Sequence, residues 1–137
     1  TQYIQDLLKQ GKIKLDNSSD VSKVTFHDPC YLGRHNSEFD APRDDLKKLG
    51  VNYIELERSK ESSFCCGAGG AQMWKEEEPG KQPVRQNRMQ EIVESGAETV
   101  CTACPFCLTM MRDAGNELDA QVQAKDLAEI FAEKLAE

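Results

Sequence analysis

The alternation of hydrophobic and polar positions predicts strands and helices in regular succession along the chain. Short runs typical of strands occur at residues 21–26, 51–56, 98–102 and 121–125, and the first of them alternates apolar and polar residues as a half-buried strand would. Apolar residues recur at helical spacing over residues 1–12, 41–49, 83–95, 105–115 and 126–135. Strands that alternate with helices of this length predict parallel βαβ units, and hence a small, Rossmann-like α/β domain whose helices cover a parallel sheet.

Capping residues and glycines indicate where these elements begin and end. Asp40 is expected to cap the second helix, which Gly50 ends, and Gly115 is expected to end the helix that follows the third strand. Asp126 and Glu129 form a D-x-x-E pattern that predicts a capped last helix. The polar residues 16–20 predict a loop before the first strand.

The length and the charge of the chain limit the number of domains and the kinds of partner that it can have. The 137 residues fit one domain, and the chain starts with threonine rather than methionine, so we expect a domain excised from a longer polypeptide. With 17 basic and 24 acidic side chains the formal charge is −7, which argues against binding to nucleic acid or to an anionic membrane surface. No apolar run approaches the ~20 residues that cross a bilayer, so we expect no direct membrane insertion by this segment.

Cysteines carry most of the chemical information in this sequence. The six of them fall in three separated segments, as Cys30, the adjacent pair Cys65 and Cys66, and the cluster Cys101, Cys104 and Cys107. The first and third segments follow predicted strands. Because ligands of parallel α/β sheets gather outside the carboxyl ends of the strands, we expect these thiols to meet at one edge of the sheet.

A metal-sulfur site explains this arrangement better than a disulfide framework. Nothing in the chain sends it to an oxidising compartment, and in a reducing cytoplasm clustered cysteines favour metal binding or catalysis. Several thiolates in one pocket repel one another, so a cation must supply the compensating charge. Zinc needs only four ligands, whereas a fifth thiol favours iron and sulfide; zinc remains the alternative.

Three motifs resemble those of a known family. They are HDPCYLGR at residues 27–34, FCCGAGG at residues 64–70 and ACPFCLTM at residues 103–110. Together they resemble the cysteine-rich CCG domain of heterodisulfide reductase and related iron-sulfur oxidoreductases. The resemblance is closest to the C-terminal region of the large reductases linked to electron-transfer flavoproteins. It covers residues 24–135, so residues 1–137 are interpreted as a single CCG-type domain.

This resemblance implies a set of ligands and a cofactor. Carried over by position, the five ligands are Cys30, Cys65, Cys66, Cys104 and Cys107, and the cofactor is an iron-sulfur cluster of the 4Fe-4S type. In heterodisulfide reductase, cysteines of this pattern hold a noncubane cluster at which a disulfide is cleaved. Cys101 departs from the pattern. It creates a second interpretation in which Cys101 and Cys104 close the site, and a simpler one in which Cys101 is a small buried hydrophobic residue.

The function implied is that of an electron-transfer domain in a larger oxidoreductase. It would pass single electrons between a flavoprotein or ferredoxin-like donor and a terminal acceptor, such as a quinone pool reached through a partner membrane domain. Its partners would be other domains or subunits of that oxidoreductase. The alternatives are a cluster-based disulfide reductase and a zinc-binding structural or interaction domain. We expect a cytoplasmic location, with attachment at the cytoplasmic face of a membrane only through other parts of the polypeptide.

Residues beside the cysteines have weaker signals. His27 follows a strand, where packing and hydrogen bonding are its more frequent fate, although it could also be a ligand or proton donor. The glycines of residues 67–70 predict a turn whose bare N–H groups can donate to sulfur. Trp74 indicates a partner or core contact, and residues 76–78, all glutamate, indicate an exposed face.

Overall fold

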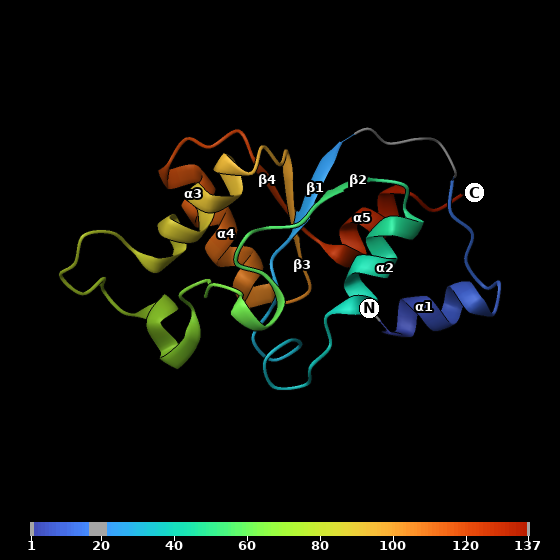
Figure 1. Ribbon diagram of the computed structural model, residues 1–137, viewed down its shortest axis with the longest axis horizontal. Helices are drawn as coiled ribbons and strands as arrows, with labels where there is room; N and C mark the ends of the chain where they lie inside the picture. Colours follow the sequence, from blue (N-terminus) through green and yellow to red (C-terminus); the bar gives the residue numbers. More distant parts are fainter. Residues whose placement is uncertain (1, 17–21, 137) are drawn as a thin grey trace.

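An entirely parallel sheet forms the centre of the molecule, seen in the computed structural model, which describes residues 2–16 and 22–136 (Figure 1). Its four strands are β1 (Lys23–Phe26), β2 (Asn52–Ile54), β3 (Thr99–Thr102) and β4 (Gln123–Asp126), in the order β2-β1-β3-β4. This confirms the predicted α/β class. Most of the loop predicted at residues 16–20, and the first residue of the strand predicted at 21–26, lie outside the described residues.

Helices cover both faces of the sheet. The α-helices are α1 (Gln2–Lys9), α2 (Asp40–Lys48), α3 (Val84–Glu94), α4 (Pro105–Glu117) and α5 (Leu127–Glu133), and the short 3-10 segments are η1 (Lys60–Ser62) and η2 (Gly69–Trp74). Figure 1 shows α3 and α4 on one face of the sheet and α2 and α5 on the other. A right-handed crossover between parallel strands leads to this three-layer arrangement.

Two predicted helix ends differ from the structure. Asp40 does not cap α2 but is its first residue, and the Glu38 carboxylate accepts the Ala41 N–H at 3.1 Å instead. Gly115 does not end α4, which continues to Glu117; it is buried inside the helix against Met89. Burial of α4 thus outweighs the low helix propensity of glycine.

Each face of the sheet packs its own hydrophobic cluster. Consecutive residues of a strand point to opposite faces, so Val100 packs with Met89 and Ile92 beneath α3 and α4, while Cys101 packs with Phe26 on the other face. The predicted cap of α5 is present: Asp126 accepts the Ala128 N–H at 2.8 Å, and Glu129 completes the capping box.

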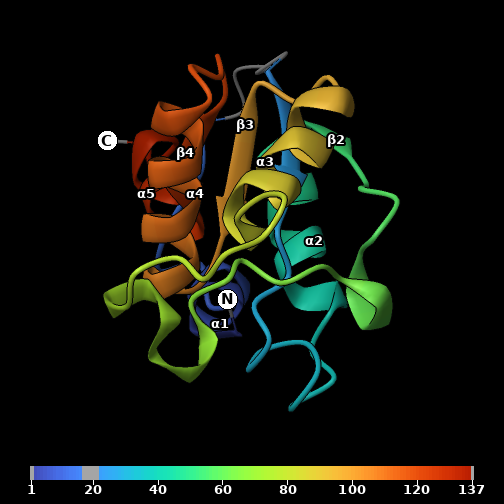
Figure 2. The ribbon, with the colours of Figure 1, turned by 90° about the vertical axis from the view of Figure 1, so that its left-hand side faces the viewer.

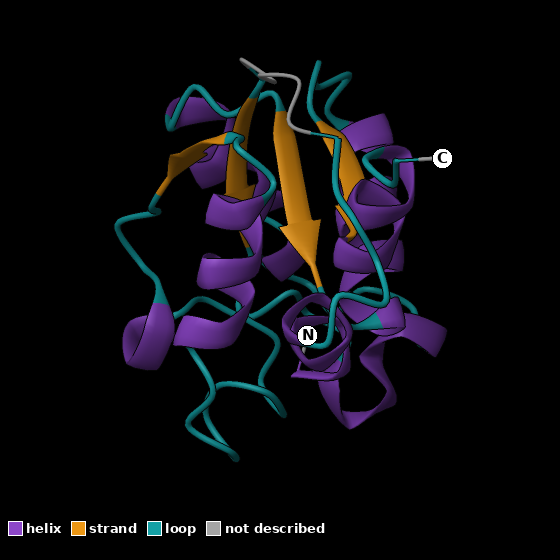
Figure 3. Ribbon diagram, turned by 90° about the vertical axis from the view of Figure 1, so that its right-hand side faces the viewer, coloured by secondary structure: helices purple, strands orange, loops and turns teal. Residues whose placement is uncertain are grey.

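The loops that carry cysteines lie together at one end of the sheet. Figure 2 shows the segment after β1 and the segment between β2 and α3 side by side below the strands, and Figure 3 shows the strand arrows pointing toward this end. The fold therefore places the cysteine motifs at the carboxyl edge, where parallel sheets bind their ligands.

Candidate thiol-rich metal centre

The segment after β1 carries the first thiol and is anchored to the sheet. The His27 N–H donates to the Cys101 carbonyl at 2.8 Å, which extends the β1–β3 ladder by one residue and buries the imidazole. Pro29 and Gly33 then form a turn, because the Gly33 N–H donates to the Pro29 carbonyl at 2.9 Å. Cys30 leaves the sheet at this turn and is exposed.

Polar contacts connect this segment with the one that precedes Cys65. The Asp28 carboxylate accepts the backbone N–H of Lys60 at 2.8 Å, and it also accepts two hydrogen bonds from Arg43 on α2. Arg34 donates to the Ser63 carbonyl. The segments that carry Cys30 and Cys65 are therefore held against each other by polar contacts of the protein itself.

The adjacent cysteines point to different environments. Cys66 is buried, whereas Cys65 is exposed and accepts the Gly67 N–H on its Sγ at 3.3 Å. Gly67 has φ +89° and a Cβ there would lie 3.3 Å from the Cβ of Val84, so glycine is required at this position. One N–H group of this turn, that of Gly67, thus donates to a cysteine sulfur, while donation to a bound cluster stays a prediction.

The start of α4 contributes the third group of thiols. Pro105 occupies the first turn and Cys104 the N-cap position, where it is half-buried and packs against the α3/α4 hydrophobic cluster. Cys107, one turn later, is 3% exposed and faces the site. Pro at the first helical position fixes this start, because its missing N–H costs no hydrogen bond there.

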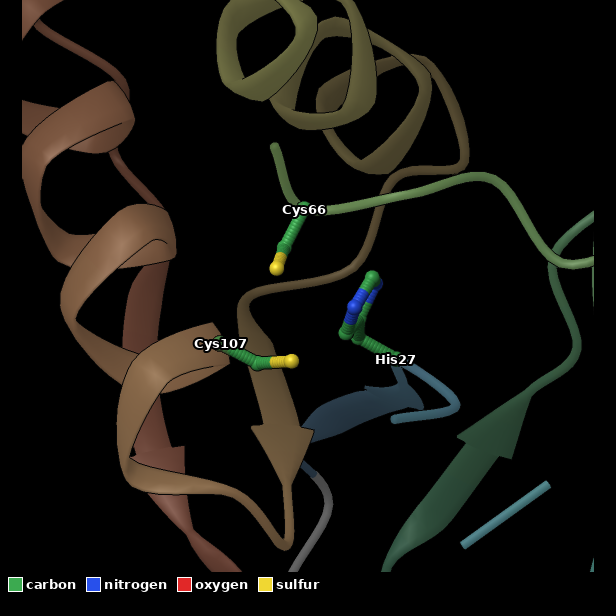
Figure 4. A group of neighbouring side chains, drawn as sticks. All are labelled: His27, Cys66 and Cys107. Atoms are coloured by element: carbon green, nitrogen blue, oxygen red, sulfur yellow. The ribbon is translucent and has the colours of Figure 1, made fainter. Parts of the chain in front are cut away.

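The segment after β1, the segment before α3 and the start of α4 bring three possible ligand atoms together. One ring nitrogen of His27 and the sulfurs of Cys66 and Cys107 all lie within 4.8 Å of one another, and all three side chains are buried (Figure 4). The surrounding cavity of about 30 Å³ is lined by sulfur-bearing and cationic side chains, among them Cys30, Cys65, Cys66, Cys107 and Arg34. Three distant stretches of sequence therefore share one pocket.

The thiols favour their protonated form in this pocket. The hydrogen bond with Cys107, together with burial, raises the pKa of Cys66 to about 11. The hydrogen bond with Cys66, together with burial, raises the pKa of Cys65. A cation that replaces these protons would supply the charge that stabilises the thiolates.

Two cysteines lie apart from the cavity. Cys101 is completely buried on the α2/α5 face of the sheet, and burial raises the pKa of its thiol. Cys104 does not line the cavity, although it lies one helical turn from Cys107. The five-ligand set remains a prediction: the structure brings four of its members to one cavity, and the fifth, Cys104, packs against the hydrophobic cluster that contains Cys66 and Cys107.

Sequence reasoning missed the charged side chains that hold the site. His27 packs and hydrogen-bonds as predicted, but its partner is Arg88, a fully buried arginine on α3 whose Nε donates to His27 Nδ1 at 3.1 Å. Burial and the neighbouring Arg88 lower the pKa of His27 to about 3. The only sequence signal for Arg88 is a charged residue directly before Met89 on the apolar face of its helix.

The donor set fits an iron-sulfur centre. Sulfur-rich ligands select iron-sulfur clusters or zinc, and the cavity lining meets that requirement. The cavity is small, about 30 Å³, and the exposed cysteines Cys30 and Cys65 line its rim. Binding of a larger centre would therefore be coupled to the order of the loops that carry these two residues.

Free thiols from separate segments gather at the carboxyl edge of a parallel sheet, which is the arrangement of a cysteine-rich α/β domain. Comparison with known proteins places the chain in the family described as the cysteine-rich domain, CCG, which matches residues 24–112. The chain belongs to this family. No solved structure matches it significantly.

Three of the similar proteins are named as oxidoreductases or as a subunit of one, and each is several times longer than this chain. The chain is 43% identical to the EtfAB:quinone oxidoreductase of Syntrophomonas wolfei, covering 96% of this chain and 19% of that protein. It is 38% identical to the probable iron-sulfur-binding oxidoreductase FadF of Bacillus subtilis, and the match covers 98% of this chain and 19% of that protein. It is 37% identical to one of the subunits of the dihydromethanophenazine:CoB–CoM heterodisulfide reductase of Methanosarcina acetivorans. That match covers 98% of this chain and 33% of the subunit.

The chain thus spans about a fifth to a third of the length of these relatives. Among the helices of residues 2–16 and 22–136, none combines the length and the apolar character that crossing a bilayer requires.

Proposed function

We propose that this chain is an iron-sulfur-binding domain that transfers single electrons within a larger oxidoreductase. The observation that carries the proposal is the shared cavity of Cys30, Cys65, Cys66 and Cys107, which come from three segments of a CCG-family domain. Relatives named as iron-sulfur-binding oxidoreductase and as quinone oxidoreductase support the same chemistry.

The ligands of the proposed cluster are Cys30, Cys65, Cys66, Cys104 and Cys107. When bound, a 4Fe-4S cluster, cubane or noncubane, supplies a site that accepts and releases one electron at a time. The protein contributes thiolates, a Gly67 N–H directed at sulfur and a buried polar surround. Cys104, at the N-cap position of α4 and three residues before Cys107, is the one member of this set that does not line the cavity.

The proposed partners are other domains or subunits of the oxidoreductase, with a flavoprotein or ferredoxin-like donor and a terminal acceptor such as quinone. Support comes from the small share of each relative that the chain covers, and from the name of the quinone oxidoreductase. The proposed setting is reducing and cytoplasmic, because clustered cysteines stay available as metal ligands where thiols are kept reduced.

A second candidate function is disulfide cleavage at the centre. It is favoured by the exposure of Cys30 and Cys65, which opens the cavity to solvent, and by a relative named heterodisulfide reductase. The two functions differ in whether a small disulfide reoxidises the reduced centre. Stopped-flow mixing of the reduced protein with a disulfide decides between them.

Anaerobic purification or reconstitution with iron and sulfide tests the proposal. We expect a brown protein with stoichiometric iron and sulfide, visible absorption that bleaches on reduction, and an electron paramagnetic resonance signal. A colourless protein that retains zinc after anaerobic isolation and takes up no iron would contradict the proposal and support the zinc-binding structural domain.

A further inference from the structure

A buried histidine–arginine pair stands directly behind the thiols. The Arg88 side chain is completely buried, and its Nε donates to His27 Nδ1 at 3.1 Å. Its Nη1 donates to the Glu91 carboxylate at 2.8 Å and to the Arg58 carbonyl at 3.0 Å. Several fixed partners hold the guanidinium in one orientation, so Arg88 in turn holds the imidazole.

The direction of this hydrogen bond determines where the imidazole carries its proton. A guanidinium has only donors, so His27 Nδ1 must accept with its lone pair. A proton on Nδ1 would set two N–H groups against each other, and a doubly protonated ring would also set two cations side by side. The neutral ring therefore carries its single proton on Nε2.

The thiol side of the ring is then a donor rather than a ligand. Figure 4 shows a ring nitrogen on the edge that faces the sulfurs of Cys66 and Cys107, and one nitrogen lies within 4.8 Å of both. A protonated nitrogen has no lone pair for a metal, but it can donate a hydrogen bond to a sulfur.

We propose that His27, oriented by Arg88, donates its Nε2–H to the sulfur of the centre held at Cys66 and Cys107 and does not ligate the metal. This inference rests on the proposed iron-sulfur function. The N–H donor stabilises the more negative, reduced centre, so the oriented imidazole raises its reduction potential. His27 and Arg88 are thus residues that position a donor and tune the potential.

The tautomer can be measured without iron. The chain has two histidines, and the exposed His35 is a built-in reference. In a long-range ¹H–¹⁵N spectrum of the iron-free protein, we expect His27 to show a protonated Nε2 and an unprotonated Nδ1, and the spectrum of His35→Phe identifies which signals belong to His27. In Arg88→Met this preference should be lost. A protonated Nδ1 of His27 in the unsubstituted protein would overturn the inference.

The effect of His27 on the reduction potential of the centre is measured in the protein reconstituted with iron and sulfide. His27→Phe removes the donor but keeps a ring, and we expect it to retain iron while its reduction potential shifts to more negative values. His27→Gln, which keeps an N–H, should restore part of the shift, and His35→Phe should cause none.

Loss of iron in both His27 variants, with full iron in His35→Phe, would make His27 a ligand and overturn the inference. An unchanged potential in His27→Phe would overturn it equally. If the unsubstituted protein takes up no iron, the proposed function fails, and the role of His27 toward the centre fails with it; the iron-free spectrum still decides the tautomer on its own.

Discussion

Arg43 donates two hydrogen bonds to the Asp28 carboxylate, at 2.8 and 2.9 Å, in a pair whose side chains are 5% and 2% exposed. This buried ion pair joins α2 to the residue two positions before Cys30. The same carboxylate accepts the Lys60 N–H, so one side chain connects α2, the Cys30 loop and the segment leading to Cys65. The site is thus braced by charges that lie outside the cysteine motifs.

Removal of Arg43 should destabilise the fold strongly. In Arg43→Ala the Asp28 carboxylate stays buried without its counter-charge, and breaking such a pair costs roughly 3–5 kcal/mol. Urea unfolding followed by circular dichroism gives the change in the free energy of unfolding. Lys47→Ala is the matched control, because Lys47 and Asp44 form an exposed pair at 3.7 Å on the same helix. Equal, small effects of both substitutions would show that the buried pair does not brace the fold.

Cys107→Ser should prevent assembly of the iron-sulfur centre, because Cys107 lies in the shared cavity and hydroxyl oxygen is a poor ligand for iron in such clusters. Iron and sulfide analysis after anaerobic reconstitution measures the effect. Cys101→Ala is the control: Cys101 lies on the opposite face of the sheet, so this variant should load normally. Loss of iron in Cys101→Ala with retention in Cys107→Ser would reverse the assignment of the closing pair.

Asp45→Asn should stabilise the protein at neutral pH. Asp45 is fully buried on α2, its carboxylate has no hydrogen-bond partner among the described residues, and Gln5 donates to the Ala41 carbonyl instead. Burial raises the pKa of Asp45 above its usual 3.8, so the charged form disfavours the folded state.

The gain from Asp45→Asn should depend on pH with a definite sign. Below the unfolded pKa near 3.8 the carboxyl is protonated in both states, and the substitution changes little. As the pH rises above that value, ionisation stabilises the unfolded state more than the folded one, so the gain should grow until the folded pKa is passed. Urea midpoints of both proteins between pH 3 and pH 8 measure it, and a gain that is largest in acid would contradict this account.

Trp74 should report the loading of the site. It is the only tryptophan, it is exposed, and its ring meets Phe106 edge-on at 5.9 Å between centroids, so it touches the residue that precedes Cys107. A nearby iron-sulfur centre absorbs tryptophan emission, so reconstitution should quench the fluorescence. Cys107→Ser treated in the same way should keep its emission, and an equal loss in both proteins would assign the quenching to free iron.

The local sequence pattern was sufficient to predict most of the helices and strands. The short run of strand-forming residues over 98–102 and the D-x-x-E pattern at Asp126 are both readable within a few residues, and β3 and the capped α5 occur where expected. Where the local rule failed, tertiary packing overrode it: α4 runs through Gly115 because the helix is buried against α3 at that point. Helix ends depend on such contacts as much as on the residue at the end.

By itself, the sequence determined the parallel α/β class and the position of the cysteine motifs after strands, because periodicity and capping are local properties. Only the tertiary structure decided which thiols meet. Cys101 and Cys107 lie six positions apart in sequence, yet strand alternation turns one to the α2/α5 face while α4 turns the other into the cavity. The His27–Arg88 bond spans 61 positions, and no local pattern specifies such a pairing, because it depends on how β1 and α3 pack in three dimensions.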